Sequence, residues 1–324
     1  MSKYTGLAAV LMAALALPAF GNSAVQGNWE GGFTAAGWKD QALRAEIIGQ
    51  PGNTYRALLR VGDLPAVELV GMSRSDAAVF IGEFELGDKG KFIGRAQARG
   101  GEMHGELLAI TGDSSAAFTM KKVLKQSPTL GEAPPRGAVV LLGEGVAEDA
   151  WTLQPGNIVN HELRIGGNTY VSGYEHGDAR LHVEFICPYM PNDSGQARGN
   201  SGVYVHGRYE VQVLDSFGDA PGVGTCGAIY SIAVPPPGAC LPPGEWQTYD
   251  ITFKAPRFDA NGKKTEDAVI TVLHNGMTLY DNMVLPHTTP GGVSGDESAH
   301  GPLMLQNHGD EVRFRNVWVL PLEK

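Results

Sequence analysis

The chain has 324 residues, and its 44 glycines and 20 prolines together make up about a fifth of the sequence. Average proteins carry roughly 12% of these two residues, so the excess predicts many tight turns and short strands rather than long helices. Hydrophobic residues at 43% are sufficient for packed cores, which excludes a disordered chain. At about 150 residues per domain, the length predicts two domains.

The charge is unevenly distributed along the chain. The formal net charge is −10, and the acidic excess lies after residue 137, where 22 acidic and 11 basic side chains occur. Because a nucleic-acid-binding protein needs a basic face to meet the phosphates, this balance excludes nucleic acid as a partner. Neutral sugars or cations are the ligands that fit this charge better.

The first 21 residues have the pattern of a cleavable signal peptide. Lys3 gives a short positive start, an apolar run follows over residues 6–20, and small residues surround a cleavage point at Gly21 or at Ala24. Since this run is shorter than the roughly 20 residues that span a bilayer, we expect no membrane anchor. The sequence therefore predicts a periplasmic or secreted protein.

A small β-rich domain is predicted over residues 22–125. Short stretches such as 55–61 and 78–86 alternate between apolar and polar side chains and are separated by Gly or Asp. This period of two is typical of antiparallel strands. No catalytic side chains gather in this part of the chain.

Residues 138–324 form the second predicted domain, which follows a Pro-rich, semi-rigid linker over residues 126–137. Turn signals such as Asn275-Gly276 separate its strands, and no segment beyond the signal peptide has a convincing helical period. Many strands without helices predict an all-β fold, either a β-sandwich or a jelly roll. The clearest predicted strands cover residues 182–186, 202–205, 209–214, 248–253, 268–274, 303–306 and 312–320.

The densest group of polar residues lies on one of these strands. Val211 and Val213 would occupy its buried face, so Glu210 and Gln212 point the other way. Strict alternation would bury Asp215 with the valines, which is costly for a carboxylate, so we expect a β-bulge that returns it to the polar face. The three polar residues would then form one row on an open sheet. The alternative is a solvated face with unrelated carboxylates.

The last strands repeat this pattern of polar residues on one face. Gln306 and His308 share a face with Met304, and Arg315 shares one with Arg313 further along. A lone histidine is more often structural than catalytic, but Gln306 and two arginines accompany this one. We therefore keep both interpretations of His308 open.

Three more candidates come from single positions. Glu184 stands between Val183 and Phe185, so it should also face away from the core. His274 precedes a turn, where a hydrogen bond to the backbone is the competing interpretation. Trp246 lies where a strand begins, and core packing competes there with stacking on a sugar ring.

Three cysteines remain, and one disulfide plus one free thiol is the simplest arrangement in an oxidising compartment. Cys226 and Cys240 flank the Pro-rich loop 235–238, so we predict a disulfide between them. The two pairings that involve Cys187 stay open.

Several motifs follow one another in order between residues 138 and 321. They are NSGVY (200–204), GRYEVQVLDS (207–216), CGAIY (226–230), PGEWQTY (243–249), HNG (274–276), GPLMLQNHG (301–309) and VRFRNVW (312–318). Together they resemble the 3-keto-disaccharide hydrolase family, also described as 3-keto-glucoside 1,2-lyase/3-keto-2-hydroxyglucal hydratase. The resemblance implies a concanavalin A-like jelly-roll β-sandwich with a carbohydrate site on its concave sheet, preceded here by the small β-rich domain.

Two departures from related patterns bear on the site. Laminarinase-type glucanases of this fold place Glu, Asp and Glu on a bulged strand, and Glu210, Gln212 and Asp215 repeat that spacing with Gln in the middle. An ordinary retaining mechanism is therefore in doubt. Many relatives also have Arg where Ile186 stands, so either that substrate contact is missing here or Arg198 replaces it.

The resemblance implies an enzyme that cleaves 3-keto-glycosides. A ketone at C3 acidifies the proton on C2, a base removes it, the enolate expels the group on C1, and water adds back. This sequence gives net hydrolysis. We assign the base to Glu210 or His308, the acid to Glu184 or Asp215, and enolate stabilisation to Arg315 or a divalent cation.

The remaining expectations concern binding and the rival functions. The predicted substrate-binding residues are Gln212, Gln306, Arg315, Arg198, Trp246 and His274. No cofactor beyond that divalent metal ion is expected, and its ligands are unknown. A conventional glycoside hydrolase would use Glu210 and Asp215 as its carboxylate pair, whereas a sugar-binding module would use the same face without acid–base residues.

Overall fold

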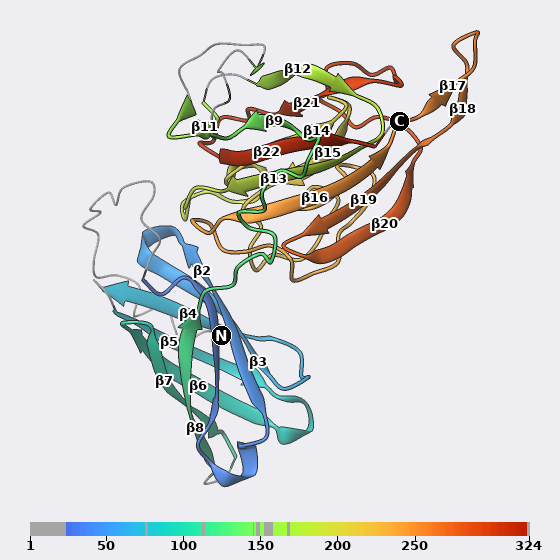
Figure 1. Ribbon diagram of the computed structural model, residues 1–324. Helices are drawn as coiled ribbons and strands as arrows, with labels where there is room; N and C mark the ends of the chain where they lie inside the picture. Colours follow the sequence, from blue (N-terminus) through green and yellow to red (C-terminus); the bar gives the residue numbers. More distant parts are fainter. Residues whose placement is uncertain are drawn as a thin grey trace.

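The computed structural model describes residues 24–74, 77–111, 114–144, 146, 150–151, 158–166 and 169–322, so the predicted signal peptide lies outside it. The described chain is almost entirely β and forms two bodies, one after the other (Figure 1). Helical turns in these ranges are short 3₁₀ segments: η1 (Ala36–Trp38), η2 (Pro51–Asn53), η3 (Gly87–Lys89) and η5 (Gly195–Ala197). Over the same ranges, no helix has the length and apolar character needed to cross a membrane.

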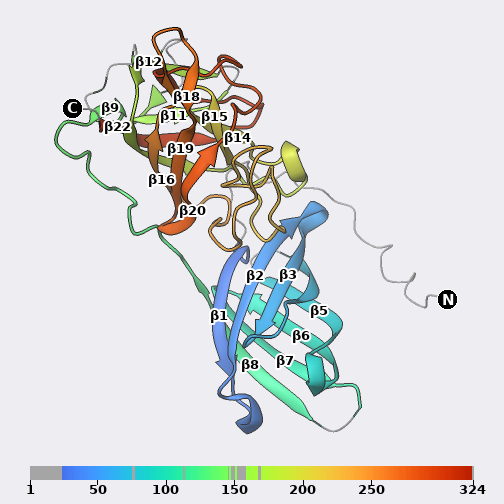
Figure 2. The ribbon, with the colours of Figure 1, turned by 90° about the vertical axis from the view of Figure 1, so that its right-hand side faces the viewer.

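The first body is a closed barrel in which each strand pairs antiparallel with the next and the last pairs back with the first (Figure 2). Every second side chain turns inward, and residues such as Trp29, Leu59 and Phe118 fill the interior. The alternation read from the sequence is therefore the alternation between the barrel interior and its outer surface. The strands are β1 (Gly27–Phe33), β2 (Ala42–Gln50), β3 (Thr54–Val61), β4 (Val67–Arg74), β5 (Ala77–Glu85), β6 (Lys91–Arg99), β7 (Glu102–Ala109) and β8 (Ser115–Val123).

The second body is a sandwich of two antiparallel sheets, which confirms the predicted jelly-roll class. The large sheet runs in the order β10 (Ile158–Val159), β11 (Glu162–Arg164), β22 (Arg313–Pro321), β13 (Ala179–Ile186), β16 (Gln247–Lys254), β19 (Ala268–His274) and β20 (Met277–Leu285), with β9 (Val139–Leu142) beside β22. The small sheet runs in the order β12 (Tyr170–His176), β21 (Gly301–Leu305), β14 (Ser201–Val205) and β15 (Tyr209–Val213). A separate hairpin joins β17 (Arg257–Phe258) to β18 (Lys264–Glu266).

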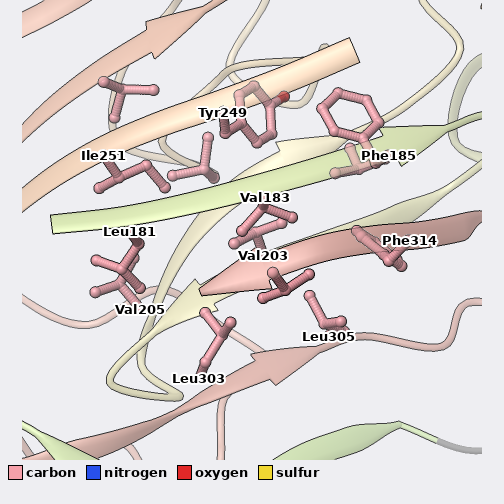
Figure 3. Close-up of a cluster of buried hydrophobic side chains, with 14 of the residues drawn as sticks. Leu181, Val183, Phe185, Val203, Val205, Tyr249, Ile251, Leu303, Leu305 and Phe314 are labelled. Atoms are coloured by element: carbon pink, nitrogen blue, oxygen red, sulfur yellow. The ribbon is translucent and has the colours of Figure 1, made fainter. Parts of the chain in front are cut away.

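The core of this body lies between the two sheets (Figure 3). Val183 from β13 of the large sheet and Val203 from β14 of the small sheet are both fully buried in it. Because alternate residues of each strand enter the core, the residues between them point away from the sandwich. Glu184 therefore lies on the outer face of the large sheet, and Glu210 lies on the outer face of the small sheet.

The strands predicted for this body are all present, with ends that differ by a few residues. The turn between β19 and β20 has φ values of +51° at Asn275 and +79° at Gly276. Two successive positive φ angles are what a type I′ hairpin turn requires, which explains why Asn-Gly occupies it.

The two bodies contact each other where β2 and β3 meet the loop that follows β15. Arg56 on β3 donates to the carbonyl oxygen of Gly218 at 2.9 Å and pairs with Asp219 at 3.1 Å. Asp219 also accepts a 2.7 Å hydrogen bond from Arg198. A Cβ atom on Gly218 would lie 2.5 Å from Cδ1 of Ile48, so the barrel packs tightly against this loop.

Candidate functional site

A row of polar residues lies on the outer face of the small sheet, in the place predicted for Glu210 and Gln212. Val211 is fully buried in the core, so its two neighbours point outward. Both outward side chains are nevertheless covered, with Glu210 2% and Gln212 1% exposed. We call the outward-facing residues Asn200, Gly202, Tyr204, Glu210, Gln212 and Gln306 the small-sheet row.

Tyr204 is the direct cross-strand neighbour of Glu210. Its hydroxyl donates to Oε2 of Glu210 at 2.7 Å and also lies 2.9 Å from the carbonyl oxygen of Pro290. Gln306 donates from Nε2 to the same hydroxyl at 3.1 Å. Gly202 leaves the space for this arrangement, since a Cβ there would collide with the carboxylate of Glu210. The row thus fixes one carboxylate against a single hydrogen-bond donor, the hydroxyl of Tyr204.

The burial of Glu210 determines its acid–base behaviour. Desolvation raises the pKa of Glu210 to about 7, although the hydrogen bond from Tyr204 opposes the rise. Desolvation and the neighbouring Glu210 raise the pKa of Tyr204 far above its ordinary value, so the phenol keeps its proton. A carboxyl group that titrates near neutral pH is suited to take and return a proton.

The other end of the row holds an amide cluster. Gln212 donates from Nε2 to Oε1 of Gln196 at 3.2 Å, and Asn200 donates from Nδ2 to the same oxygen at 3.2 Å. The carbonyl oxygens of the Gln212 and Asn200 side chains are buried and have no hydrogen-bond partner among the described residues. Buried acceptors normally find donors, so these two oxygens are candidates to accept hydrogen bonds from a ligand.

Gln306 belongs to the row, whereas His308 does not. The backbone N–H of Gln306 donates to the carbonyl oxygen of Gly202 at 2.9 Å, which places Gln306 beside Gly202 on the side opposite Gln212. His308 lies beyond the end of β21 in an exposed turn. Glu210, not His308, is therefore the candidate base held within the row.

The bulge expected on β15 is not present, and Asp215 lies outside the row. Pairing of β14 with β15 is regular from Ser201–Val213 to Val205–Tyr209, and Leu214 then also enters the core. Asp215 forms an ion pair with Arg198 at 3.3 Å. Desolvation raises the pKa of Asp215 to about 7, although the positive charge of Arg198 acts to lower it. These two predicted site residues line a pocket next to the barrel instead of joining Glu210.

Glu184 and Arg315 meet on the opposite side of the sandwich. Arg315 donates from Nε to Oε2 of Glu184 at 2.7 Å. The other carboxylate oxygen, Oε1 of Glu184, accepts from Gly131 N at 2.6 Å and from Asn316 Nδ2 at 2.9 Å. Burial would raise the pKa of Glu184, but hydrogen bonds from His182 and these donors lower it to about 2. The core separates this fully bonded carboxylate from Glu210.

The comparison with known proteins shows the family. The sequence profile of the 3-keto-alpha-glucoside-1,2-lyase-like domain matches residues 139–320, which is more than half of the chain. This chain belongs to that family. The expectation raised by the motifs is confirmed, and the lyase-like domain is the jelly-roll body. The family relationship makes the protein a carbohydrate-active enzyme.

Two solved structures are similar to this lyase-like domain. A crystal structure of a candidate glycosyl hydrolase from Parabacteroides distasonis ATCC 8503 shares 32% identity at a TM-score of 0.53 and covers 58% of this chain and 85% of its own. A second crystal structure of a candidate glycosyl hydrolase from the same organism shares 16% identity with this chain at a TM-score of 0.38. The match covers 58% of this chain and 89% of that protein. No curated protein is significantly similar to the chain.

The segment predicted as a linker covers the Glu184 side of the lyase-like domain. Ser127 and Thr129 bond to Thr248 at 2.6 Å and 3.0 Å, and Thr129 also donates to Asp250 at 2.6 Å. Trp246 lies on this side too, with its ring 4.0 Å from the guanidinium carbon of Arg315. Trp246 therefore stacks on the side chain of Arg315 and does not lie beside the small-sheet row.

One group of residues on this side has the spacing of metal ligands. Donor atoms of Glu132, His182 and Asp250 lie within 4.8 Å of one another. Each already has a protein partner, because Asp250 accepts from His182 Nδ1 at 2.7 Å and Glu132 accepts from Arg180 at 3.0 Å. The charges of the group are thus compensated by His182 within it and by Arg180 outside it, so the three residues do not fit a metal ion.

His274 lies in the interior of the lyase-like domain. It continues the inward face of β19, which also carries Ile270 and Val272, and is fully buried. Its Nε2 donates to the side-chain oxygen of Gln247 at 2.9 Å. Burial lowers the pKa of His274 to about 3, so the ring is neutral. The residue is a hydrogen-bonded core histidine, away from the row.

All three cysteines are free thiols, so the predicted disulfide between Cys226 and Cys240 is not formed. These two thiols lie in hydrogen-bond contact with each other, and the Cys226 sulfur is also 3.3 Å from the Tyr249 hydroxyl. The loop brings the pair together as expected, and the Cys240 sulfur also contacts the carbonyl oxygens of Leu214 and Leu241.

Sequence reasoning missed the two tyrosines beside Glu210. Tyr204 occupies the outward face of β14 next to Gly202, and Tyr230 follows the fully buried Ile229. Both stand in motifs that we had noted, NSGVY and CGAIY, and alternation with their apolar neighbours would have placed them on the polar face. Their signal was weak because an isolated tyrosine beside valine or isoleucine also fits a core position.

Proposed function

We propose that this protein is an exported enzyme that cleaves 3-keto-glycosides at the small-sheet row by removal of the C2 proton, 1,2-elimination and rehydration. The family relationship supports the substrate class, and the signal-peptide pattern supports export. The observation that carries the proposal is the carboxyl of Glu210, which is buried beside one neutral hydrogen-bond donor, Tyr204, and has a pKa raised to about 7.

Glu210 acts as the general base in this proposal. With a ketone at C3, the proton on C2 is acidic enough for a carboxylate to remove, and the electron pair moves towards the C3 oxygen. When Glu210 is ionised, its Oε2 is held by Tyr204, and Oε1 faces the space left by Gly202. Its proton returns to C2 when water adds to C1.

The uncharged side chains of the row stabilise the enolate and hold the sugar. Tyr204 donates its one hydroxyl proton to Glu210, so the second N–H of the Gln306 amide takes the part that the sequence had assigned to Arg315. The buried side-chain oxygens of Gln212 and Asn200 accept hydroxyl protons from the same sugar. This division of roles needs no second carboxylate on the row.

A conventional glycosidase fits the geometry less well. Its mechanism requires two carboxyl groups on either side of one glycosidic bond. Asp215, the partner expected for Glu210, is bound to Arg198, and Glu184 lies across the core. The keto-sugar mechanism requires only one of these carboxylates as a base.

The test compares 3-ketotrehalose with trehalose as substrates of the purified mature chain. We expect released glucose, with transient enone absorbance, from the oxidised sugar alone. Glu210→Gln should lower turnover by about 10²–10⁴-fold, whereas Glu266→Gln, the same change at an exposed hairpin residue, should not. Cleavage of trehalose would favour the glycosidase, and binding of both sugars without turnover would favour a sugar-binding module.

The N-terminus of the protein recovered from the periplasm or the medium tests export. We expect the mature chain to begin at residue 22 or 25, directly after one of the two predicted cleavage points.

A further inference from the structure

The loop after β15 returns to pair with β15 itself. Val211 and Ile229 form an antiparallel bridge, Gln212 N donates to the carbonyl oxygen of Ala228 at 2.9 Å, and Tyr230 N donates to that of Glu210 at 3.2 Å. This register places Tyr230 directly across from Glu210. Residues 227–230 therefore extend the small sheet by one short segment beyond β15.

Side-chain alternation places Tyr230 on the same face as Glu210. Ile229 is fully buried in the core, as is its bridge partner Val211. The next residue along the segment must point away from the core, towards the row. Cβ atoms of residues directly opposite each other are about 4.5–5.5 Å apart, so Glu210 stands between two tyrosines, Tyr204 on β14 and Tyr230 on the returning loop.

The two tyrosines differ in how their hydroxyls are engaged. The Tyr204 hydroxyl contacts Glu210, Pro290 and Gln306. The Tyr230 side chain is half-buried, and its hydroxyl has no hydrogen-bond partner in the described part of the chain. Electrostatic interaction with Tyr230 contributes to the raised pKa of Tyr204, so the two phenols lie near each other.

We propose that Tyr230 is the proton donor to the leaving oxygen on C1, an inference that rests on the proposed elimination at the same site. Elimination needs an acid. The two carboxylates that the sequence offered lie elsewhere, since Asp215 is paired with Arg198 and Glu184 is paired with Arg315. A free phenol beside the base is the acid that the geometry supplies.

The proton and electron balance follows from these positions. Glu210 takes the C2 proton, the C1–oxygen bond breaks as the C1–C2 double bond forms, and the Tyr230 hydroxyl proton goes to the departing alkoxide. In the rehydration step, the Tyr230 phenolate takes a proton from water while the oxygen of that water adds to C1. Glu210 then returns its proton to C2. Both residues regain their starting states, and the net reaction consumes one water.

The experiment varies the leaving group in Tyr230→Phe, which keeps the ring and removes only the hydroxyl. We expect cleavage of 3-ketotrehalose to fall by about 10²–10⁴-fold. The 3-keto p-nitrophenyl glucoside, whose leaving group needs no acid, should be cleaved within a few fold of the wild-type rate. Tyr55→Phe, the same change inside the barrel beside Ser73, is the matched control and should leave both rates unchanged.

The outcomes separate this inference from the proposed function. Equal loss on both substrates would assign Tyr230 a structural role and overturn the inference, and so would unchanged cleavage of 3-ketotrehalose. Failure of the wild-type protein to cleave either keto-sugar would instead overturn the proposed function. Because Glu210→Gln removes the base, it should lower cleavage of both substrates by about 10²–10⁴-fold, unlike Tyr230→Phe.

Discussion

The hydroxyl of Tyr204 and the carboxyl of Glu210 are joined by a 2.7 Å hydrogen bond between neighbouring strands of the small sheet. This bond favours the ionised carboxylate, yet desolvation outweighs it and raises the pKa of Glu210 to about 7. A salt bridge in place of the phenol would have held the carboxylate ionised at lower pH and made it a weaker base.

The pH dependence of kcat/KM should therefore have an acidic limb with a midpoint near pH 7. The base acts in its ionised form, so the rate rises as pH increases through the pKa of Glu210. Tyr204→Phe removes the hydrogen bond that lowers this pKa, and its midpoint should move to higher pH. Rates with 3-ketotrehalose between pH 5 and 9 check both statements. A midpoint that moves to lower pH in Tyr204→Phe would contradict the assignment.

Gly202→Ala should lower activity by disturbing Glu210 and Tyr204, although Gly202 itself carries no side chain. A Cβ at this position would displace the carboxylate of Glu210 and lie 2.9 Å from Cε2 of Tyr204. We expect kcat to fall at least tenfold together with a lower Tm, since the row must shift. Gly173→Ala on β12 of the same sheet is the control, because its Cβ would meet only Ala150 O at an ordinary 3.6 Å.

Stability should fall on the alkaline side because of His182. Burial would lower the pKa of His182, but hydrogen bonds to Asp250 and Glu184 raise it to about 9. A raised pKa contributes stability that is fully present below about pH 6.5 and is lost as pH rises through 9. Urea unfolding at pH 6, 7.5 and 9.5 should show this loss.

The matched variant for this prediction is His182→Gln. Leaving buried Asp250 without its cation, while Glu184 keeps Arg315, should cost about 3–5 kcal/mol. Its stability should also depend less on pH between 6.5 and 9 than that of the wild type. The comparison is needed because Glu210 and Asp215 also make the fold less stable as pH rises, as their pKa values are raised from 4.5 and 3.8 to about 7. Their contribution is lost between those values and about pH 7, so it overlaps only the start of the range in which His182 titrates. Parallel pH curves for the two proteins would show that His182 is not the cause.

Contact between the barrel and the jelly roll should depend on Gly218. Its φ is +75°, and an added Cβ would lie 2.5 Å from Ile48 of the barrel. Gly218→Ala should separate the bodies and speed proteolysis between them. Gly238→Ala, also at positive φ but with no atom within 4 Å, should cost only the strain of about 1–3 kcal/mol. Equal proteolysis of both variants would contradict a tight contact at Gly218.

The outward position of the candidate residues was predictable, but their grouping was not. Alternation beside valine or phenylalanine correctly placed Glu184 and Glu210 away from the core. A sandwich has two outward faces, however, and strand patterns are the same on both. Only strand order assigns β13 and β15 to different sheets. Long-range pairing of this kind has no local sequence signal.

Asp215 shows a second limit. The sequence correctly predicted that burying this carboxylate in the core would be unfavourable, and it predicted a β-bulge that would turn the side chain outward. The chain instead leaves the sheet after Val213, and a cation from another loop, Arg198, compensates the carboxylate. The buried position of His274 could be predicted in part, because Ile270, Val272 and His274 alternate with partly exposed residues and so share the inward face of β19. Its hydrogen bond to Gln247 depended on the neighbouring strand.

The position of β22 has a consequence for how the protein folds as the chain emerges from its N-terminus onward. The barrel needs only contacts between successive strands and the closure of β1 with β8, so it can close once Val123 has emerged. The large sheet cannot, because β22 lies between β11 and β13 and also pairs with β9. Until Arg313–Pro321 emerges, that sheet has two halves with unpaired edges. The nascent jelly roll should therefore be the part that depends on chaperones, beside a barrel that has already folded.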